Sequence, residues 1–141
     1  MIMHLHNKHA VKRLLLVGCG LLFALPLQAE CWIADRLQGF SAGSNDEYQF
    51  IEDSFNPGML VCFQGDSGTV TGNDLPLIRI GESTLIGVSM NPNGLETVNT
   101  YQIDREAMKL LLTQTRIGTP AITDLLPDYA AVFVGDIRKS Q

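Results

Sequence analysis

Hydrophobic and polar residues after position 30 come in short runs, and turn-forming residues interrupt these runs every eight to twelve positions. Residues 47–52 show the pattern clearly, because Tyr48 and Phe50 alternate with Glu47 and Gln49. A repeat of two residues puts successive side chains on opposite faces of a β-strand. The pattern predicts an all-β domain, a small antiparallel β-barrel or sandwich of about eight strands.

Turn residues divide this domain into its predicted strands. The clearest turn is at residues 91–94, because an Asn-Gly pair suits the tight turn of a β-hairpin. In the first strand, Trp32, Ala34 and Leu37 are candidates for the core. The predicted strands span residues 32–40, 47–52, 59–64, 75–80, 83–90, 95–103 and 129–134, with a brief one at 69–71.

Residues 104–116 fit two interpretations. Asp104 could begin a short helix near residues 105–114, where helix propensity is high. Alternatively, residues 104–107 form the turn of a hairpin whose return strand is 108–116, and the β-prone residues that follow favour this hairpin. Residues 119–128 contain two prolines and predict a loop, or one helical turn near 119–127.

The first 29 residues are typical of a secretory signal peptide. Three basic residues precede the apolar stretch 14–27, and residues 27–29 suit a cleavage site. The apolar stretch is shorter than the roughly 20 residues that a spanning helix needs. We therefore expect one β domain at residues 30–141, in the periplasm or secreted, without stable membrane insertion. Lipidation at Cys19, after Leu16-Val17-Gly18, is a minor alternative.

Cleavage at this point also changes the inventory of reactive residues. It leaves two of the three cysteines, Cys31 and Cys62, which we expect to pair in an oxidising compartment. It removes all three histidines, at positions 4, 6 and 9. Histidine is the most common general base and zinc ligand. The sequence therefore predicts no catalytic residue, no metal site and no cofactor in the exported domain.

One motif resembles the nucleophile motif of trypsin-like serine proteases. Cys62 is followed by Phe-Gln and then by Gly-Asp-Ser-Gly, at residues 65–68. Those proteases need a histidine to accept the serine proton, and none follows residue 9. The same four residues suit a hairpin turn, which is the interpretation we prefer.

Charge indicates the kind of partner. Three of the ten Lys and Arg residues, and none of the fifteen Asp and Glu residues, precede position 30, which leaves seven bases against fifteen acids. Such a domain repels nucleic acid and anionic membranes and suits a basic protein partner. Phe55, in an expected loop, and Tyr129 are aromatic residues that the core does not require. The candidate partner-binding residues are Asp46, Glu47, Phe55, Asp66, Ser67, Asp74 and Tyr129.

These features together predict a non-enzymatic binding protein, an inhibitor or immunity-type protein that acts on a basic partner such as a lytic hydrolase. In architecture, the expected small exported β domain resembles the small periplasmic lysozyme inhibitors, although it shares no motif with them. One alternative is a lipocalin-like carrier of a small apolar ligand. A second is a glycosidase that uses two carboxylates, with the acids at 46–47 and 52–53, Asp66 and Asp74 as candidates.

Overall fold

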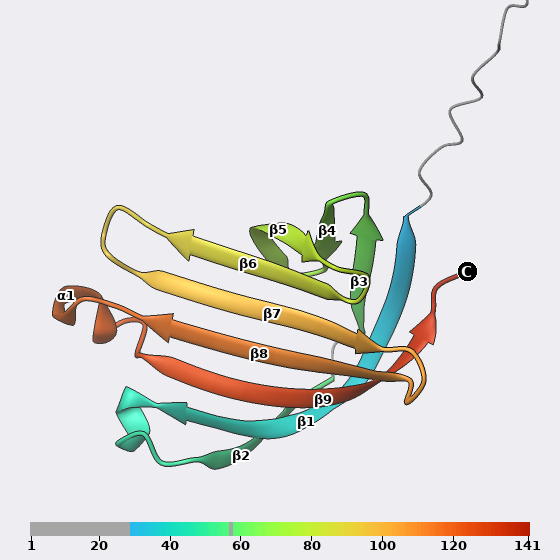
Figure 1. The fold of residues 1–141 in the computed structure, drawn as a ribbon. Helices are drawn as coiled ribbons and strands as arrows, with labels where there is room; N and C mark the ends of the chain where they lie inside the picture. Colours follow the sequence, from blue (N-terminus) through green and yellow to red (C-terminus); the bar gives the residue numbers. More distant parts are fainter. Residues whose placement is uncertain (1–28, 57) are drawn as a thin grey trace, which may run out of the picture.

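Nine β-strands form one antiparallel sheet (Figure 1). This computed structural model describes residues 29–56 and 58–141, so the expected signal peptide, apart from Ala29, and Cys19 lie outside the described residues. A 3-10 turn, η1 (Ser44–Asp46), follows the first strand, and a short helix, α1 (Pro120–Thr123), precedes the last. The strands are β1 (Glu30–Gly43), β2 (Ile51–Phe55), β3 (Met59–Gln64), β4 (Ser67–Val70), β5 (Asn73–Ile80), β6 (Thr84–Met90), β7 (Glu96–Asp104), β8 (Lys109–Ile117) and β9 (Tyr129–Lys139).

The sheet closes into a barrel because β1 pairs with other strands along both of its edges. One edge pairs with β9 over almost its whole length. The other edge pairs first with β3, at residues 30–34, and then with β2, at residues 37–41. Eight strands, β1 and β3 to β9, make the closed barrel, and β2 is an extra strand beside the second half of β1. The predicted all-β antiparallel barrel is confirmed.

The hairpin interpretation of residues 104–116 is also confirmed. β7 and β8 pair from Asp104 and Lys109 at the turn to the far ends of both strands. The Asp104 Oδ1 atom accepts hydrogen bonds from the backbone N–H groups of Glu106 and Ala107, at 3.0 and 2.9 Å. The aspartate therefore stabilises a turn instead of starting a helix. The helical turn lies in the later loop, where α1 begins with Pro120.

The prediction for the second strand is wrong in position. Residues 44–46 form η1, and Glu47 and Tyr48 then adopt left-handed backbone angles, with φ of 53° and 59°. The alternating residues from 47 onward therefore lie in a loop, and β2 begins only at Ile51. β1 and β9 are both longer than predicted, because each continues to pair beyond the apolar residues that marked it.

The placement of Phe55 needs the same correction. The sequence placed it in a loop and away from the core, but it is the last residue of β2. It packs against the core cluster, with its ring edge-on to Phe133 and the two ring centroids 5.0 Å apart. Alternation along β2 turns Asp53 and Phe55 toward the barrel interior. Phe55 is therefore an interior residue of the barrel.

The barrel has two different halves. We call the end with the β1–β2, β6–β7 and β8–β9 connections the open end, and the opposite end, with Glu30 and Lys139, the closed end. The core cluster includes the predicted Trp32, Ala34 and Leu37, all at most 6 % exposed, and it fills the closed half with apolar side chains. Toward the open end, the inward positions carry polar groups such as Asn99 and Ser41, which are both buried.

An arginine covers the closed end. The Arg105 guanidinium donates hydrogen bonds to the Glu30 carboxylate at 3.0 and 2.9 Å and to the Ser83 hydroxyl at 2.6 Å. It also lies over the ring of Trp32, 5.9 Å from the ring centroid. The hydrogen bonds from Arg105 lower the pKa of Glu30 below its ordinary value. The Arg105–Glu30 ion pair thus covers the Trp32 ring at the closed end of the barrel.

Candidate functional site

A pocket of about 470 Å³ lies in the open half of the barrel. Tyr101 and Phe133, which belong to the core cluster, line its inner side. Several strands contribute to the walls, so the pocket is a feature of the barrel and not of one loop. The lining residues are Asp53, Phe55, Met59, Thr71, Gly72, Asn73, Asn99, Tyr101, Gln114, Tyr129 and Phe133.

The pocket lies where the barrel wall is incomplete. β2 and β3 follow each other along the same edge of β1, but only β3 has a strand on its other side, since β4 ends at Val70. Across the gap from β2 lies the β4–β5 turn with Thr71 and Gly72. The pocket is lined from both sides of this gap, by residues of β2 and by residues of the turn.

Hydrogen-bonding groups line the inside of the pocket. The Tyr101 hydroxyl accepts a hydrogen bond from Asn73 Nδ2 at 2.8 Å, and Asn73 Oδ1 accepts one from the backbone N–H of Leu75 at 2.9 Å. Asn99 and Gln114 lie beside the same hydroxyl. Burial raises the pKa of Tyr101 above its ordinary value, which already lies well above physiological pH, so the phenol is neutral. The inside is therefore polar but carries no charge of its own.

The charge in the pocket comes from its edge. Asp53 points inward from β2 and lies near Tyr129, the first residue of β9. Burial raises the pKa of Tyr129, and the Asp53 carboxylate raises it further. Arg116 lies over the Tyr129 ring, 5.6 Å from its centroid, and donates its Nε–H to the Pro127 carbonyl. Arg116 is thus engaged with the β8–β9 loop, and Asp53 is the carboxylate that lines the pocket.

The open half also carries almost all of the net charge. Eight acids and one base, Arg116, lie there, against seven acids and six bases in the closed half. Ion pairs in the closed half join Arg36 and Lys109 to Asp136, Arg105 to Glu30 and Arg138 to Asp35, whereas none joins an open-half acid to a base within residues 29–56 and 58–141. The open-half acids are Asp46, Glu47, Glu52, Asp53, Asp74, Glu96, Asp124 and Asp128.

The loops around the open end are held together by Asp128. Its Oδ2 accepts a hydrogen bond from the Tyr48 hydroxyl at 3.0 Å, and its Oδ1 accepts one from the Gly118 N–H at 2.9 Å. Its carbonyl accepts a third, from the N–H of Ser44 at 3.0 Å. One aspartate thus joins the β1–β2 loop to the β8–β9 loop. The bond to Asp128 raises the pKa of Tyr48, because the neutral phenol is the donor.

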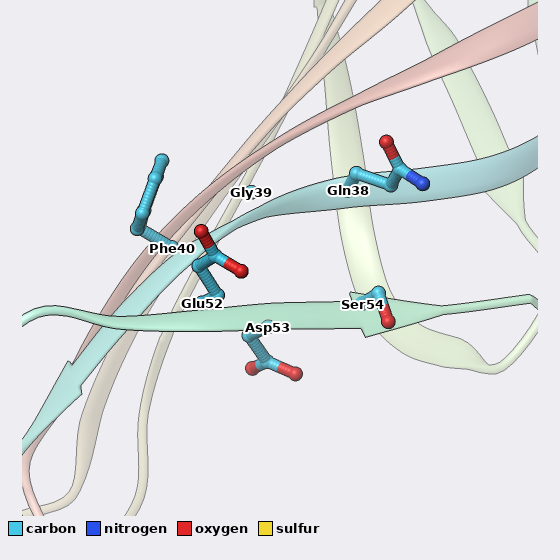
Figure 2. Close-up of a pocket in the computed structure, with 6 residues that line it drawn as sticks. All are labelled: Gln38, Gly39, Phe40, Glu52, Asp53 and Ser54. Atoms are coloured by element: carbon cyan, nitrogen blue, oxygen red, sulfur yellow. The ribbon is translucent and has the colours of Figure 1, made fainter.

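A second cavity, of about 590 Å³, lies along β1 and β2. Gln38 and Phe40 from β1 and Glu52 and Ser54 from β2 line it together with Gly39 and Asp53. In Figure 2 the Glu52 side chain extends on the same side as Phe40, whereas Asp53 extends to the opposite side of β2. The carboxylates of Glu52 and Asp53 therefore do not face each other across a common cleft.

The structure separates the predicted partner-binding residues into two groups. Asp46, Glu47 and Asp74 lie exposed in the open half, and Tyr129 and Phe55 line the pocket there. Asp66 and Ser67 lie in the β3–β4 turn, at the other end of the barrel. Ser67 donates its hydroxyl to the Gln64 carbonyl at 3.1 Å, as turn residues often do. The two groups therefore do not form one site.

The polar residues inside the barrel were not among the site residues predicted from the sequence. Asn99 and Tyr101 alternate with outward residues of β7, and Gln114 follows buried Leu112 on the same face of β8. One signal in the sequence could have indicated them: polar residues at positions that the alternation predicts to face inward. That signal becomes usable only once the pairing of the strands is known.

The predicted disulfide is present between Cys31 and Cys62, which are direct partners in the β1–β3 ladder. This bond fits an oxidising compartment. Within the described residues, no group of three or more His, Cys, Asp or Glu side chains is arranged to hold a metal ion. None of the helices described here has both the length and the apolar character needed to cross a membrane.

Comparison of the chain with protein-family models, with curated proteins and with solved structures finds no match. The function is therefore inferred from the site alone.

Proposed function

We propose that this protein is a non-enzymatic binding protein that attaches to a basic protein partner through its open end. An exported inhibitor or immunity-type protein that acts on a basic lytic hydrolase is the class that fits best. The observation that supports this proposal is the uneven charge of the barrel, with eight acids against one base in the open half. Complementary charge of this kind speeds up association and selects the partner.

The pocket offers a partly buried site for an ion pair, which an exposed charged surface alone does not provide. Surface ion pairs contribute only about 0–1 kcal/mol each. A desolvated ion pair beside aromatic rings contributes more, and such contacts lie near the centre of many protein interfaces. Asp53 and Tyr129 offer this environment to a basic side chain.

The polar lining of the pocket does not favour the two alternative functions. Small apolar ligands are held by predominantly apolar linings, whereas a carboxylate and three side-chain amides share this lining with the aromatic rings. For a glycosidase, two carboxyl groups must face one cleft, at about 5 Å or about 6.5–9.5 Å apart. Glu52 and Asp53, adjacent on one strand, extend to opposite sides of it (Figure 2).

Two charge-matched triple variants test the proposal. Asp46→Asn, Glu47→Gln and Asp74→Asn together neutralise three exposed acids of the open half. Asp66→Asn, Glu82→Gln and Glu106→Gln remove the same charge from the closed half. We expect the protein to bind a basic lytic hydrolase from a panel of lysozymes and amidases, with an affinity that falls steeply as salt is raised. The open-half triple should bind at least about tenfold more weakly, and the closed-half triple within about threefold of the parent.

Two results would contradict the proposal. The first is the absence of binding to every member of the panel at low salt. The second is an equal loss of affinity in the two triple variants, which would show that only the total charge matters. Inhibition of the bound hydrolase, measured on peptidoglycan, then separates an inhibitor from a carrier of the enzyme.

A further inference from the structure

The edge of β2 that faces away from β1 has no strand beside it. In the described part of the chain, β2 pairs with β1 alone, at residues 51–55. Every second residue of such an edge directs its backbone N–H and C=O outward, where they can pair with another extended chain. The gap beside this edge is also the place where the barrel wall is missing and the pocket opens.

Geometry links the free edge to the pocket. A strand added beside β2 would lie between β2 and the β4–β5 turn, and would continue the wall that β4 provides beside β3. Alternate side chains of the added strand would point into the barrel, toward Asp53 and Tyr129. The remaining side chains would point outward, on the face where Glu52 and Phe40 line the second cavity (Figure 2).

Charge decides which chain fits this edge. Adjacent residues of β2, Glu52 and Asp53, put a carboxylate on each face of the strand. If two copies of this protein paired antiparallel through β2 around Asp53, like charges would oppose each other, which is destabilising. A basic segment would meet an opposite charge on both faces. Arg116, the nearby base, is held against Pro127 and Tyr129 and lies outside the pocket lining.

The chemistry of the pocket suits the end of a Lys or Arg side chain. A carboxylate, neutral amide and phenol oxygens and four aromatic rings surround the space. Cations bind the faces of aromatic rings and accept no hydrogen bonds, so they need surroundings of oxygen atoms. Tyr101 and Tyr129 each have an aromatic ring and a neutral phenol oxygen, so they can supply both kinds of contact.

We propose that an extended basic segment of the partner adds as a strand to the free edge of β2 and inserts one Lys or Arg side chain through the gap into the pocket beside Asp53. This inference rests on the proposed basic partner and specifies how it is held. The segment is about five residues long, because β2 offers residues 51–55. Recognition by strand addition gives affinity through the main chain and specificity through alternate side chains.

Synthetic peptides test this proposal without knowledge of the partner. The probe is a ten-residue peptide of alternating Lys and Val, compared with one of alternating Glu and Val, and binding is measured by calorimetry at low salt. A third peptide keeps the Lys-Val sequence but carries N-methyl groups on alternate residues, in either register. Methylation removes the donors that an added strand needs and leaves the charge unchanged.

We expect the Lys-Val peptide to bind, the Glu-Val peptide not to bind, and N-methylation in one register to weaken binding at least about tenfold. Asp53→Asn should also weaken Lys-Val binding about tenfold, whereas Glu106→Gln, with the same charge change in the β7–β8 turn, should change it less than about twofold. Hydrogen exchange should show new protection on binding of those amides within residues 51–55 that point away from β1. Unchanged melting temperatures would confirm that both variants are folded.

The outcomes separate this inference from the proposed function. Equal binding by Asp53→Asn and Glu106→Gln, or no effect of N-methylation in either register, would overturn strand addition. If the basic hydrolase still bound more weakly to the open-half triple, the proposed function would stand without it. If the peptide behaved as expected and no basic hydrolase bound, recognition of a basic strand would stand and the hydrolase partner would be wrong.

Discussion

Replacing Cys31 and Cys62 together by serine is expected to lower the free energy of unfolding by roughly 3–4 kcal/mol. The disulfide joins residues separated by 31 positions, and closing a loop of this length restricts the unfolded chain by that amount in the chain-entropy model. Both cysteines are half-buried and next to inward-facing residues, Trp32 and Phe63, so their own side chains lie outside the core. Serine should therefore add no cavity penalty.

The assay is denaturation by urea and by heat, each followed by circular dichroism, with and without a reductant. For a domain of this size, 1 kcal/mol shifts the melting temperature by about 4 °C, so the double variant should melt about 15 °C below the oxidised parent. Reductant should bring the parent to the level of the double variant and leave the variant unchanged. A loss below about 1 kcal/mol with an unchanged denaturant slope would refute this reasoning, since pairing of β1 with β3 and β9 would then suffice.

Three further predictions concern stability. Leu112→Ala should lower the free energy of unfolding in urea by about 2–5 kcal/mol, and Leu111→Ala by less than about 1 kcal/mol. The reason is that Leu112 is fully buried, whereas Leu111 is 41 % exposed on the other face of β8; similar losses of stability would contradict the assigned register. Gly39→Ala should lower the free energy of unfolding by about 3 kcal/mol, because a Cβ at this position would lie 1.8 Å from a carbonyl oxygen of β9. Gly43→Ala should be tolerated, because the nearest atom to a Cβ there is 3.4 Å away. Equal melting temperatures of the two variants would contradict this prediction. The stability of the protein should fall below about pH 4.5. The pKa of Glu30 is lowered in the folded state, so its carboxylate stabilises the fold above the unfolded pKa, and protonation removes that contribution. Glu30→Gln should show a shallower decline with falling pH, and an identical decline would exclude the Glu30–Arg105 pair as the cause.

Much of the barrel could be predicted from the sequence because its signals are local. Turn residues and alternation located most strands, and the Asn-Gly turn of residues 91–94 does lie between β6 and β7. The error at residues 47–52 has a clear physical cause. The alternation there is real, but two consecutive left-handed residues, Glu47 and Tyr48, interrupt the extended backbone, and hydrogen bonds to Gly43 and Asp128 stabilise the loop. Asp128 lies 80 positions away in the chain, so the local pattern could not reveal this partner.

The site was harder to predict because it depends on which strands become neighbours. Asp53 was noted only as one of several acids at strand ends, and its inward direction follows from the true start of β2. Asn99 lies two residues before Tyr101 on β7, and Gln114 on β8 is the direct partner of Asn99. Asn73 comes from β5, two strands away, and reaches the Tyr101 hydroxyl only because the sheet curves around the interior. The total number of acidic residues was evident from the sequence. That eight of them lie in the open half could be seen only once the strand topology was known.

The start of β1 and the end of β9 lie at the same end of the barrel, which has a practical consequence. Trp32 pairs with Lys139, so the start of β1 and the end of β9 leave the barrel side by side at the closed end. The gap beside β2 and the acidic loops lie toward the opposite end of these long strands (Figure 1). A linker attached after Gln141 would therefore hold the protein with its open end directed away from a sensor surface or a fused reporter. Immobilisation through this terminus is thus suited to screening partners by surface-based methods.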